Sequence, residues 1–371
     1  RRGVAFGRTV RRRRAQRRRV TDWNDLSARG GRVGHDLVGW VRWALGVRQV
    51  GHCGTLDPLA SGLMILCVGS ATRLVPYLTA LDKTYRAAVA LGRSTESADR
   101  EGATVATAAV TAEQVAAAPN CVREMVGDFM LPPPVYSAIK VDGQRAHRRV
   151  RRGDAVALDP RPMTVFSATN VISSDDEEPL IHWSCRVSKG TYVRSLAEEL
   201  GRRVGVPAHL AGLRRLACGR LEIADPGVVS PIETVELPPI EGRPRKFRCV
   251  LPGCSGDRAR EQTGEQLHKH LIDPVACLPL PAYAREPGDL LLTRLSHGQA
   301  CGPEHLEGFT DTLGQAELLR EGPGANRIIL HGVEDCRRIT IVARVHDGRR
   351  ALATEKVVRE ASPQAKPPKR A

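Results

Sequence analysis

The chain has 371 residues, of which 42% are hydrophobic, and a formal net charge of +15. No apolar run approaches the roughly 20 residues that span a bilayer, so we expect a soluble globular protein without a membrane partner. The length leaves room for two domains and a sizeable core. Ten cysteines are scattered without regular pairing, which predicts reduced thiols in a reducing compartment.

The positive charge is concentrated at the N-terminus. Residues 1–19 hold ten arginines and no acid, which is most of the net charge of the chain. Because so basic a segment cannot bury itself, we predict that residues 1–20 are a disordered arm. It would grip RNA, or it is a solvated tail or the remnant of a transit peptide. The predicted location is therefore mitochondrial, with the cytoplasm as the alternative.

The first predicted elements lead to a glycine-rich loop. Asp36 precedes an apolar stripe at helical spacing, which predicts a helix. Residues 51–62 read GHCGTLDPLASG, with three glycines and a proline, and the apolar run 63–68 predicts a buried strand after them. A lone carboxylate on such a rigid loop, Asp57, is a candidate nucleophile or general base. Spacing alone leaves open that Asp57 only caps the turn.

The middle of the chain alternates strands and helices. Residues 85–91 and 181–187 alternate apolar and polar side chains as half-buried strands do, and residues 112–130 have a rough helical stripe. A second helix carries Leu196, Leu200 and Val204. Asp142-Gly143 predicts a hairpin turn. Residues 145–152 hold five arginines and one histidine, which fits either phosphate contacts or a solvated charged helix.

The C-terminal third carries weaker signals. Spaced prolines beyond residue 235 predict a linker. Residues 290–292 and 339–345 are candidate strands, and Asp347-Gly348 predicts a hairpin after the second. A zinc finger typically uses two cysteines and two histidines, and this part of the chain has Cys249, Cys254, His268 and His270. The two histidines, however, stand at i and i+2 and would point to different faces of a helix.

The loop at 51–62 closely resembles the catalytic motif of the TruB family of RNA pseudouridine synthases. Further segments resemble family motifs in the same order along the chain. They are Asp82-Lys83-x-Tyr85 with Leu91-Gly92-x-x-Thr95-x-x-x-Asp99-x-x-Gly102, Tyr136-Ser137-Ala138-Ile139-Lys140, Lys189-Gly190-Thr191-Tyr192-x-Arg194 and Leu213-Arg214-Arg215-Leu216. Segment 28–34 departs from the family pattern, because only Gly31 remains of a Lys-Pro-x-Gly-x-Thr-Ser motif that braces the catalytic loop in the family.

The resemblance implies an α+β fold. It would have a pseudouridine synthase catalytic domain with a large mixed or antiparallel β-sheet flanked by helices, and a small PUA-like β domain at the C-terminus. The implied boundaries are 21–235 for the catalytic domain, about 131–160 for an RNA-clamping insert within it, 236–282 for a linker or extension, 283–358 for the PUA-like domain and 359–371 for a disordered tail.

The resemblance also assigns roles to single residues. It implies that Asp57 is the catalytic carboxylate and that Arg194 keeps it ionised. Tyr85 would stack on the target base and is a candidate acceptor of a proton from the uracil carbon. His52 would contact the RNA beside the flipped base, and Tyr192 and Leu213 would line the pocket. The remaining RNA-binding candidates, Lys83 and Lys140, would make phosphate or loop contacts. Without the motif, Tyr85, Tyr192 and Arg194 would be ordinary core residues. The resemblance implies no cofactor and no metal.

Two functions follow from this resemblance. The first is a pseudouridine synthase acting on a flipped-out uridine, the T-loop uridine of tRNA. The second is a TruB-like assembly or structural factor of a (mito)ribosomal RNP, with reduced or no activity, which the altered segment 28–34 favours. The expected partners are RNA, either a tRNA T-arm or ribosomal RNA, and ribosomal or assembly-factor proteins. A catalytic subunit of a guide-RNA particle fits less well, because Leu59-Ala60 resembles the stand-alone branch.

Overall fold

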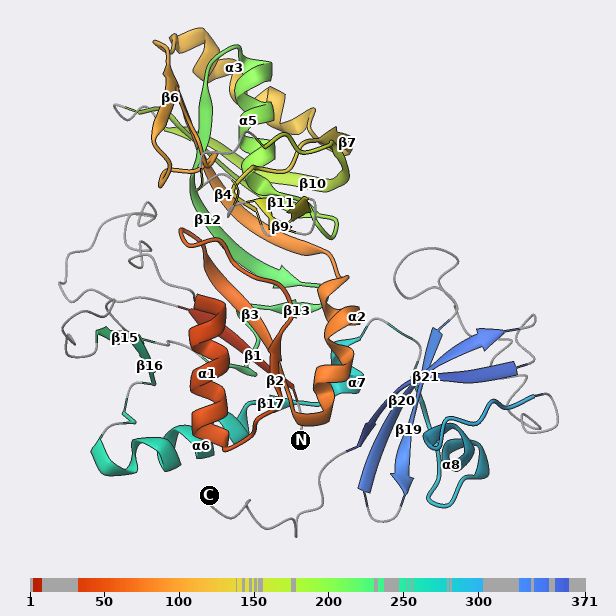
Figure 1. The fold of residues 1–371 in the computed structure, drawn as a ribbon. Helices are drawn as coiled ribbons and strands as arrows, with labels where there is room; N and C mark the ends of the chain where they lie inside the picture. Colours follow the sequence, from red (N-terminus) through yellow and green to blue (C-terminus); the bar gives the residue numbers. More distant parts are fainter. Residues whose placement is uncertain are drawn as a thin grey trace.

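A large mixed β-sheet runs through the N-terminal two thirds of the computed structural model (Figure 1). The structure describes residues 3–8, 33–137, 139–141, 144–146, 149, 152, 156–174, 178–229, 233–236, 247–251, 253–254, 256–278, 280, 282–302, 327–334, 337–346 and 351–359. The strands follow the order β14 (Val228–Val229), β1 (Gly3–Arg8), β3 (Ser61–Val68), β12 (Ala208–Cys218), β4 (Lys83–Leu91), β11 (Leu180–Val187), β10 (Arg161–Ser174) and β7 (Gly127–Leu131).

Three short strands pair with this path. They are β2 (Val50–His52) on β3, β13 (Leu221–Glu222) on β12 and β17 (Leu271–Ile272) on β1. β12 pairs with β3 in parallel and β1 pairs with β14 in parallel, while β4 pairs with β11 and β12 in antiparallel fashion. The prediction of a large mixed sheet is confirmed, and the predicted strands at 63–68, 85–91 and 181–187 lie within β3, β4 and β11.

Helices cover the sheet at its two ends (Figure 1). α3 (Ala112–Arg123) and α5 (Val193–Val204) lie at one end, where α3 contacts β10 and α5 contacts β12. α1 (Val33–Leu45) and α6 (Ala259–Lys269) pack together at the other end. The loop of Asp57 lies between these two groups, so both halves of the sheet contribute to its surroundings. One apolar core joins the two halves, with Trp183 and Leu210 fully buried in it.

The remaining elements are short. Two 3-10 helices are η1 (Gly69–Leu74) and η2 (Gly256–Arg258), and two short α-helices are α2 (Val75–Thr79) and α7 (Pro274–Cys277). Small two-stranded sheets pair β5 (Arg93–Thr95) with β6 (Thr104–Thr107), β8 (Lys140–Val141) with β9 (Gln144–Arg145), and β15 (Glu233–Glu236) with β16 (Phe247–Val250). Within the described ranges, none of the helices is long and apolar enough to cross a membrane.

A small β domain follows at the C-terminus, as predicted. Four strands, β18 (Ala282–Ala284), β19 (Arg327–Glu334), β20 (Arg337–His346) and β21 (Ala351–Arg359), form a sheet beside α8 (Leu290–Ser296). The sheet docks on η1, where Ser70 Oγ donates to Arg359 O at 2.6 Å and Arg73 Nη1 donates to Val357 O at 2.8 Å. Apolar side chains of both domains share one core cluster, so the small domain is fixed to the catalytic domain.

Two secondary-structure predictions are wrong in part. The helix predicted over 112–130 ends at Arg123, and residues 127–131 form edge strand β7, whose side chains alternate in burial. Gly127, the first residue of β7, has a φ of 139°, a backbone conformation that favours glycine. The strand predicted at 290–292 is the start of α8, because the Asp289 side chain caps the helix by accepting from Leu292 N.

The ends of the predicted domains also need correction. Residues 3–8 are not part of a disordered arm, because strand β1 completes the sheet by pairing with β3, β14 and β17. The segment predicted as a linker or extension at 236–282 is a folded extension: α6 packs on α1 and β17 pairs with β1. The rest of the arm, segment 28–32, the turns at 142–143 and 347–348, and the tail beyond Arg359 lie outside the described residues.

Gly62 allows the closest approach between β3 and β12. A Cβ atom there would lie 2.2 Å from the backbone oxygen of Arg215, and the φ of Gly62 is 106°. Gly62→Ala should therefore lower the free energy of unfolding by roughly 3 kcal/mol or more, measured by chemical denaturation. Gly69 is the control, because its φ is 64° but nothing lies within 4 Å of the added Cβ. Gly69→Ala should cost roughly 1 to 2 kcal/mol. Equal losses would contradict the importance of this contact.

Candidate active site

The loop that carries Asp57 connects β2 to β3. The two strands pair with each other, and Cys53 N extends the ladder by donating to Ile65 O at 3.0 Å. A tight turn follows, in which Ala60 N donates to Asp57 O at 2.9 Å. Gly54 has a φ of 113°, which favours glycine at this position. Pairing at the base and the turn at the tip therefore hold the Asp57 side chain in one place.

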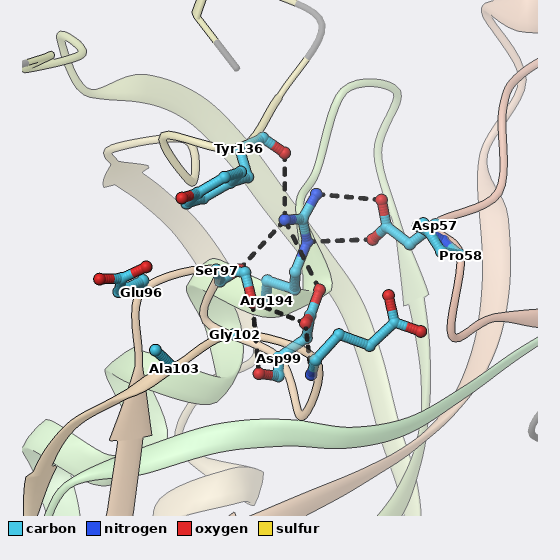
Figure 2. Close-up of a pocket in the computed structure, with 10 residues that line it drawn as sticks. Asp57, Pro58, Glu96, Ser97, Asp99, Gly102, Ala103, Tyr136 and Arg194 are labelled. Atoms are coloured by element: carbon cyan, nitrogen blue, oxygen red, sulfur yellow. Dashed lines mark hydrogen bonds and ion pairs between the residues drawn. The ribbon is translucent and has the colours of Figure 1, made fainter. Parts of the chain in front are cut away.

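Arg194 lies opposite this carboxylate, in the first turn of α5. Its Nε donates to Asp57 Oδ2 at 3.0 Å and its Nη2 donates to Oδ1 at 3.0 Å (Figure 2). The Arg194 side chain is 5% exposed, whereas the Asp57 side chain is 31% exposed. A planar guanidinium matches a carboxylate in this two-bond geometry, and its charge is not lost near neutral pH. The predicted partnership of Asp57 and Arg194 is confirmed as geometry.

Arg194 also joins two further segments to the site. Its Nη1 donates to Ser97 O at 3.1 Å and to Tyr136 O at 3.2 Å, and lies 3.8 Å from Asp99 Oδ2 (Figure 2). Between Ser97 and Asp99, Ala98 has a φ of 59°, which is rare for a residue with a side chain. This strained turn places the Ser97 carbonyl and the Asp99 carboxylate on the same guanidinium.

A pocket of about 390 Å³ opens beside the ion pair (Figure 2). Its wall combines the Asp57 loop, the segment 96–103 and the start of the insert. The lining residues are Asp57, Pro58, Glu96, Ser97, Asp99, Glu101, Gly102, Ala103, Tyr136 and Arg194. This wall contains four carboxylates and one guanidinium, so the pocket does not favour a second anion such as a phosphate.

The electrostatics of the pocket act against the charge on Asp57. Burial raises the pKa of Asp57, and the neighbouring Asp99 raises that pKa further, while Arg194 opposes both. Burial and Asp99 also raise the pKa of Glu101. The charged form of Asp57 therefore depends on Arg194, the cation that binds both of its oxygens.

Tyr85 lies on β4 and packs against the core. Its strand neighbours in register are Cys185 on β11 and Arg215 on β12. Burial raises the pKa of Tyr85, Arg215 opposes this, and Asp57 raises it further, so the phenol lies within electrostatic reach of the carboxylate. Tyr85 is not among the residues that line the pocket. The structure thus brings Tyr85 next to the Asp57 loop, on the sheet side.

Two further predicted residues lie near the ion pair. Tyr192 is the residue before α5, and its pKa is raised by burial, lowered by Arg194 and by a hydrogen bond with Ser137, and raised by Asp57. Leu213 lies on β12 opposite Ala87, is 7% exposed and belongs to the core. Neither residue is among those that line the pocket, so their predicted roles as its walls stay predictions. His52 lies on β2, half-buried, and is not among the pocket residues.

Of the two kinds of contact predicted for Lys83, the structure shows a loop contact and not a phosphate contact, and the prediction for Lys140 stays open. Lys83 is buried, and its Nζ donates to the carbonyl oxygens of Leu81 and Thr79, the latter at 2.5 Å. It ties down the end of α2, so its ammonium group does not face the site. Desolvation lowers the pKa of Lys83. The backbone of Lys140 forms part of β8, but its side chain lies outside the described residues.

The zinc hypothesis gains no support from the positions of its four residues. Cys249 and Cys254 are buried in the core cluster that also contains Leu251 and Leu267. His268 lies in the last turn of α6 and His270 follows the helix. Among the residues that the structure describes, no group of three or more His, Cys, Asp or Glu side chains could hold a metal ion.

Comparison with known proteins places the chain in a family. The family model for the N-terminal domain of TruB family pseudouridylate synthases matches residues 42–193. The tRNA pseudouridine synthase B of Opitutus terrae is 41% identical over 211 residues, which are 56% of this chain and 86% of that protein. The chain belongs to the TruB family of pseudouridine synthases, which are isomerases. The protein of the same name from Syntrophotalea carbinolica is 38% identical over 217 residues, 58% of this chain and 68% of that one.

Solved structures of low identity share the fold. One is titled as a Cbf5-Nop10-Gar1 complex, with a TM-score of 0.54 at 19% identity, covering 87% of this chain and 80% of the other. Another is an H/ACA RNP bound to a substrate RNA containing 2′-deoxyuridine, with a TM-score of 0.53 at 17% identity and the same coverage. They support the fold of this TruB family member, including its α+β class.

Three residues of the site were not predicted from sequence. Asp99 stands in the second motif but had no role assigned to it, and only its position 3.8 Å from Arg194 shows its place in the site. Tyr136 contributes a backbone carbonyl, which no sequence pattern identifies. Arg215 belongs to the Leu213-Arg214-Arg215-Leu216 motif, whose expected contribution was the apolar wall from Leu213. Its partners are backbone carbonyls of distant segments, so only the tertiary structure reveals them.

Two substitutions should move the pKa of Asp57 in opposite directions. Arg194→Met removes the cation and should raise the pKa of Asp57, whereas Asp99→Asn removes a negative charge and should lower it. Carboxyl carbon NMR titration would measure both shifts, with Asp57→Asn assigning the resonance. Because Asp57 is ionised only above its pKa, chemistry that needs the carboxylate should be lost at a higher pH in Arg194→Met. Shifts of the same sign in both variants would contradict this electrostatic account.

Proposed function

We propose that the protein converts a uridine of tRNA, the T-loop uridine, to pseudouridine, with Asp57 as the catalytic carboxylate. The observation that carries the proposal is the two-bond pairing of Asp57 with the buried Arg194 beside a pocket of about 390 Å³. This volume falls in the range of small-molecule sites and suits one extruded nucleoside. The curated relatives at 38–41% identity are named tRNA pseudouridine synthase B.

The reaction needs a carboxylate that stays ionised when the substrate closes the pocket. The bond between C1′ of the ribose and N1 of the uracil breaks, the base turns, and C1′ bonds to C5 instead. The proton of C5 leaves, and N1 gains a proton, so no atom or electron is gained overall and no redox cofactor is implied. Asp57 acts at the ribose while the first bond breaks. Arg194 keeps its carboxylate charged and oriented.

The target base must leave its stack to reach Asp57. Extrusion costs a few kcal/mol, which stacking on an aromatic face can offset. Tyr85 supplies that face in the proposal and accepts the proton of C5, while Tyr192 and Leu213 form the opposite and apolar walls. The carboxylates of Glu96 and Glu101 in the pocket wall disfavour a phosphate there, so the base and its sugar enter first.

We propose that the insert after Tyr136 contacts the RNA. Arg194 bonds the Tyr136 carbonyl, and Ser195 Oγ donates to Pro132 O at 2.7 Å, so the start of the insert is tied to the first turn of α5. An RNA held by the basic residues 145–152 would thus be linked to the site. Protein partners from a ribosomal or assembly complex and a mitochondrial location remain predictions from the N-terminal composition and the altered segment 28–34.

Asp57→Asn should abolish turnover and leave binding intact. With an unmodified tRNA carrying tritium at C5 of the T-loop uridine, the wild-type protein should release tritium to water. We expect Asp57→Asn to lower the single-turnover rate by roughly 1,000-fold or more, because the amide cannot replace the carboxylate. The tRNA dissociation constant should change by less than about threefold, since one partly buried charge contributes little to backbone binding.

Asp257→Asn is the matched control, because Asp257 is exposed in η2 and far from the site along the chain. It should leave both quantities unchanged. A wild-type protein that binds the tRNA and releases no tritium would overturn the proposal and favour a structural role on RNA. Release of tritium from a second tRNA, labelled only at uridines outside the T-loop, would keep the reaction and change the substrate position.

Lys83 provides a test of the corrected assignment. A lysine that contacts a phosphate lowers the slope of log K against log salt by about one when it is removed. Lys83 is buried on two backbone carbonyls, so Lys83→Met should leave that slope for tRNA unchanged. It should lower the free energy of unfolding by roughly 1 to 3 kcal/mol, because it leaves those carbonyls without their charged donor. A reduced slope for Lys83→Met would show that Lys83 does contact a phosphate.

A further inference from the structure

A second arginine is buried on the sheet side of the Asp57 loop. Arg215, on β12, is 2% exposed. Its Nε donates to Leu63 O at 2.7 Å, its Nη2 donates to Gly54 O at 3.2 Å, and its Nη1 lies 3.5 Å from Thr55 O. These carbonyls belong to both ends of the loop that carries Asp57. One guanidinium therefore spans the loop from its entry to the first residues of β3.

The backbone of Arg215 also has a fixed place. Arg215 pairs in parallel register with Gly62, and the missing side chain of Gly62 lets the two backbones approach so closely that a Cβ would lie 2.2 Å from Arg215 O. The Arg215 side chain therefore starts at the end of the Asp57 loop and folds back under it. Movement of the loop would break contacts to both its side chain and its backbone.

Arg215 stands directly opposite Tyr85 across the β12–β4 pairing. Burial raises the pKa of the Tyr85 phenol, and the positive charge of Arg215 opposes that rise. Within the described part of the chain, Arg215 forms no ion pair with a carboxylate, and its other partners are the loop carbonyls and the sulfur of Met64 at 3.6 Å. A buried cation with neutral partners stabilises negative charge that develops next to it.

Arginine is suited to these contacts where lysine is not. The guanidinium has five donors in a rigid fork, whereas an ammonium is a single point of charge that cannot reach three separated carbonyls together. Lysine at this position would keep the charge and lose most of the geometry. The two effects of Arg215, fixing the loop and stabilising charge on Tyr85, can therefore be separated by substitution.

We propose that Arg215 is a positioning residue of the synthase reaction, which locks the Asp57 loop and the Tyr85 phenol in one arrangement and stabilises negative charge on the phenol oxygen. The inference rests on the proposed function, in which Tyr85 accepts the proton of C5. Arg194 would then serve the carboxylate at the sugar, and Arg215 would serve the proton acceptor at the base. Each of the two reacting groups has its own buried guanidinium.

The test is the single-turnover rate of tritium release at saturating protein, measured across neutral and alkaline pH. Arg215→Gln removes both the loop contacts and the charge and should lower the neutral-pH rate by roughly 100-fold, about 10-fold from each loss. The deficit should shrink as the pH rises, because the Tyr85 phenol then ionises without the help of the cation. Arg215→Lys should lose roughly 10-fold at every pH, because it keeps the charge and loses the loop geometry.

Arg214→Gln is the control. Arg214 pairs with Arg86 and lies half-buried on the opposite face of the strand, since successive side chains alternate. It should leave the rate and its pH dependence unchanged. The tRNA dissociation constant should stay within about threefold in both Arg215 variants, which also shows that they are folded.

Three outcomes overturn the inference while leaving the proposed function in place. The first is a rate deficit of Arg215→Gln that is the same at every pH, and the second is a loss of tRNA affinity with no loss of rate. The third is a rate loss in the Arg215→Gln, Tyr85→Phe double variant that equals the product of the two single losses. Multiplying effects would show that Arg215 does not act through Tyr85. A wild-type protein that releases no tritium overturns the proposed function, and the inference falls with it.

Discussion

The Asp57–Arg194 ion pair is the interaction on which the site depends. Burial and the nearby Asp99 both raise the pKa of Asp57, so the carboxylate is charged only because a guanidinium binds its two oxygens. The same guanidinium holds the Ser97 and Tyr136 carbonyls. Removing it would therefore disturb four segments at once, and not only one charge. This explains why a fixed, always-charged arginine stands here, in the first turn of a packed helix.

The large sheet supports this pair from below. β3 and β12 are parallel neighbours, and their close approach at Gly62 places Arg215 under the loop that β3 continues. β4 brings Tyr85 to the same level by pairing with β12. The two guanidinium groups thus reach the Asp57 loop from opposite directions, one from helix α5 and one from the sheet. A rigid frame of this kind keeps reacting groups in place without the substrate having to organise them.

The contacts around the Asp57 loop bear on the altered segment 28–34. In the family, the corresponding motif braces the catalytic loop, and only Gly31 of it remains in this chain. The described residues show bracing of the loop by backbone pairing of β2 with β3 and by the side chains of Arg194 and Arg215. The geometry of Asp57 is therefore supported by elements outside segment 28–34, and the arrangement is compatible with the activity for which its relatives are named.

The sequence by itself determined the family, the α+β class, the main helices and strands, and the pairing of Asp57 with Arg194, because long motifs and apolar periodicity are local properties of the chain. It did not determine that residues 3–8 complete the sheet, that residues 127–131 leave the helix, or that Lys83 turns away from the site. Those features depend on which distant strand or carbonyl lies nearby. The roles of Asp99, Tyr136 and Arg215 were decided by tertiary structure for the same reason. Their partners are 58 or more residues away along the chain, and a buried polar group is positioned by the distant group it meets and not by its neighbours in sequence.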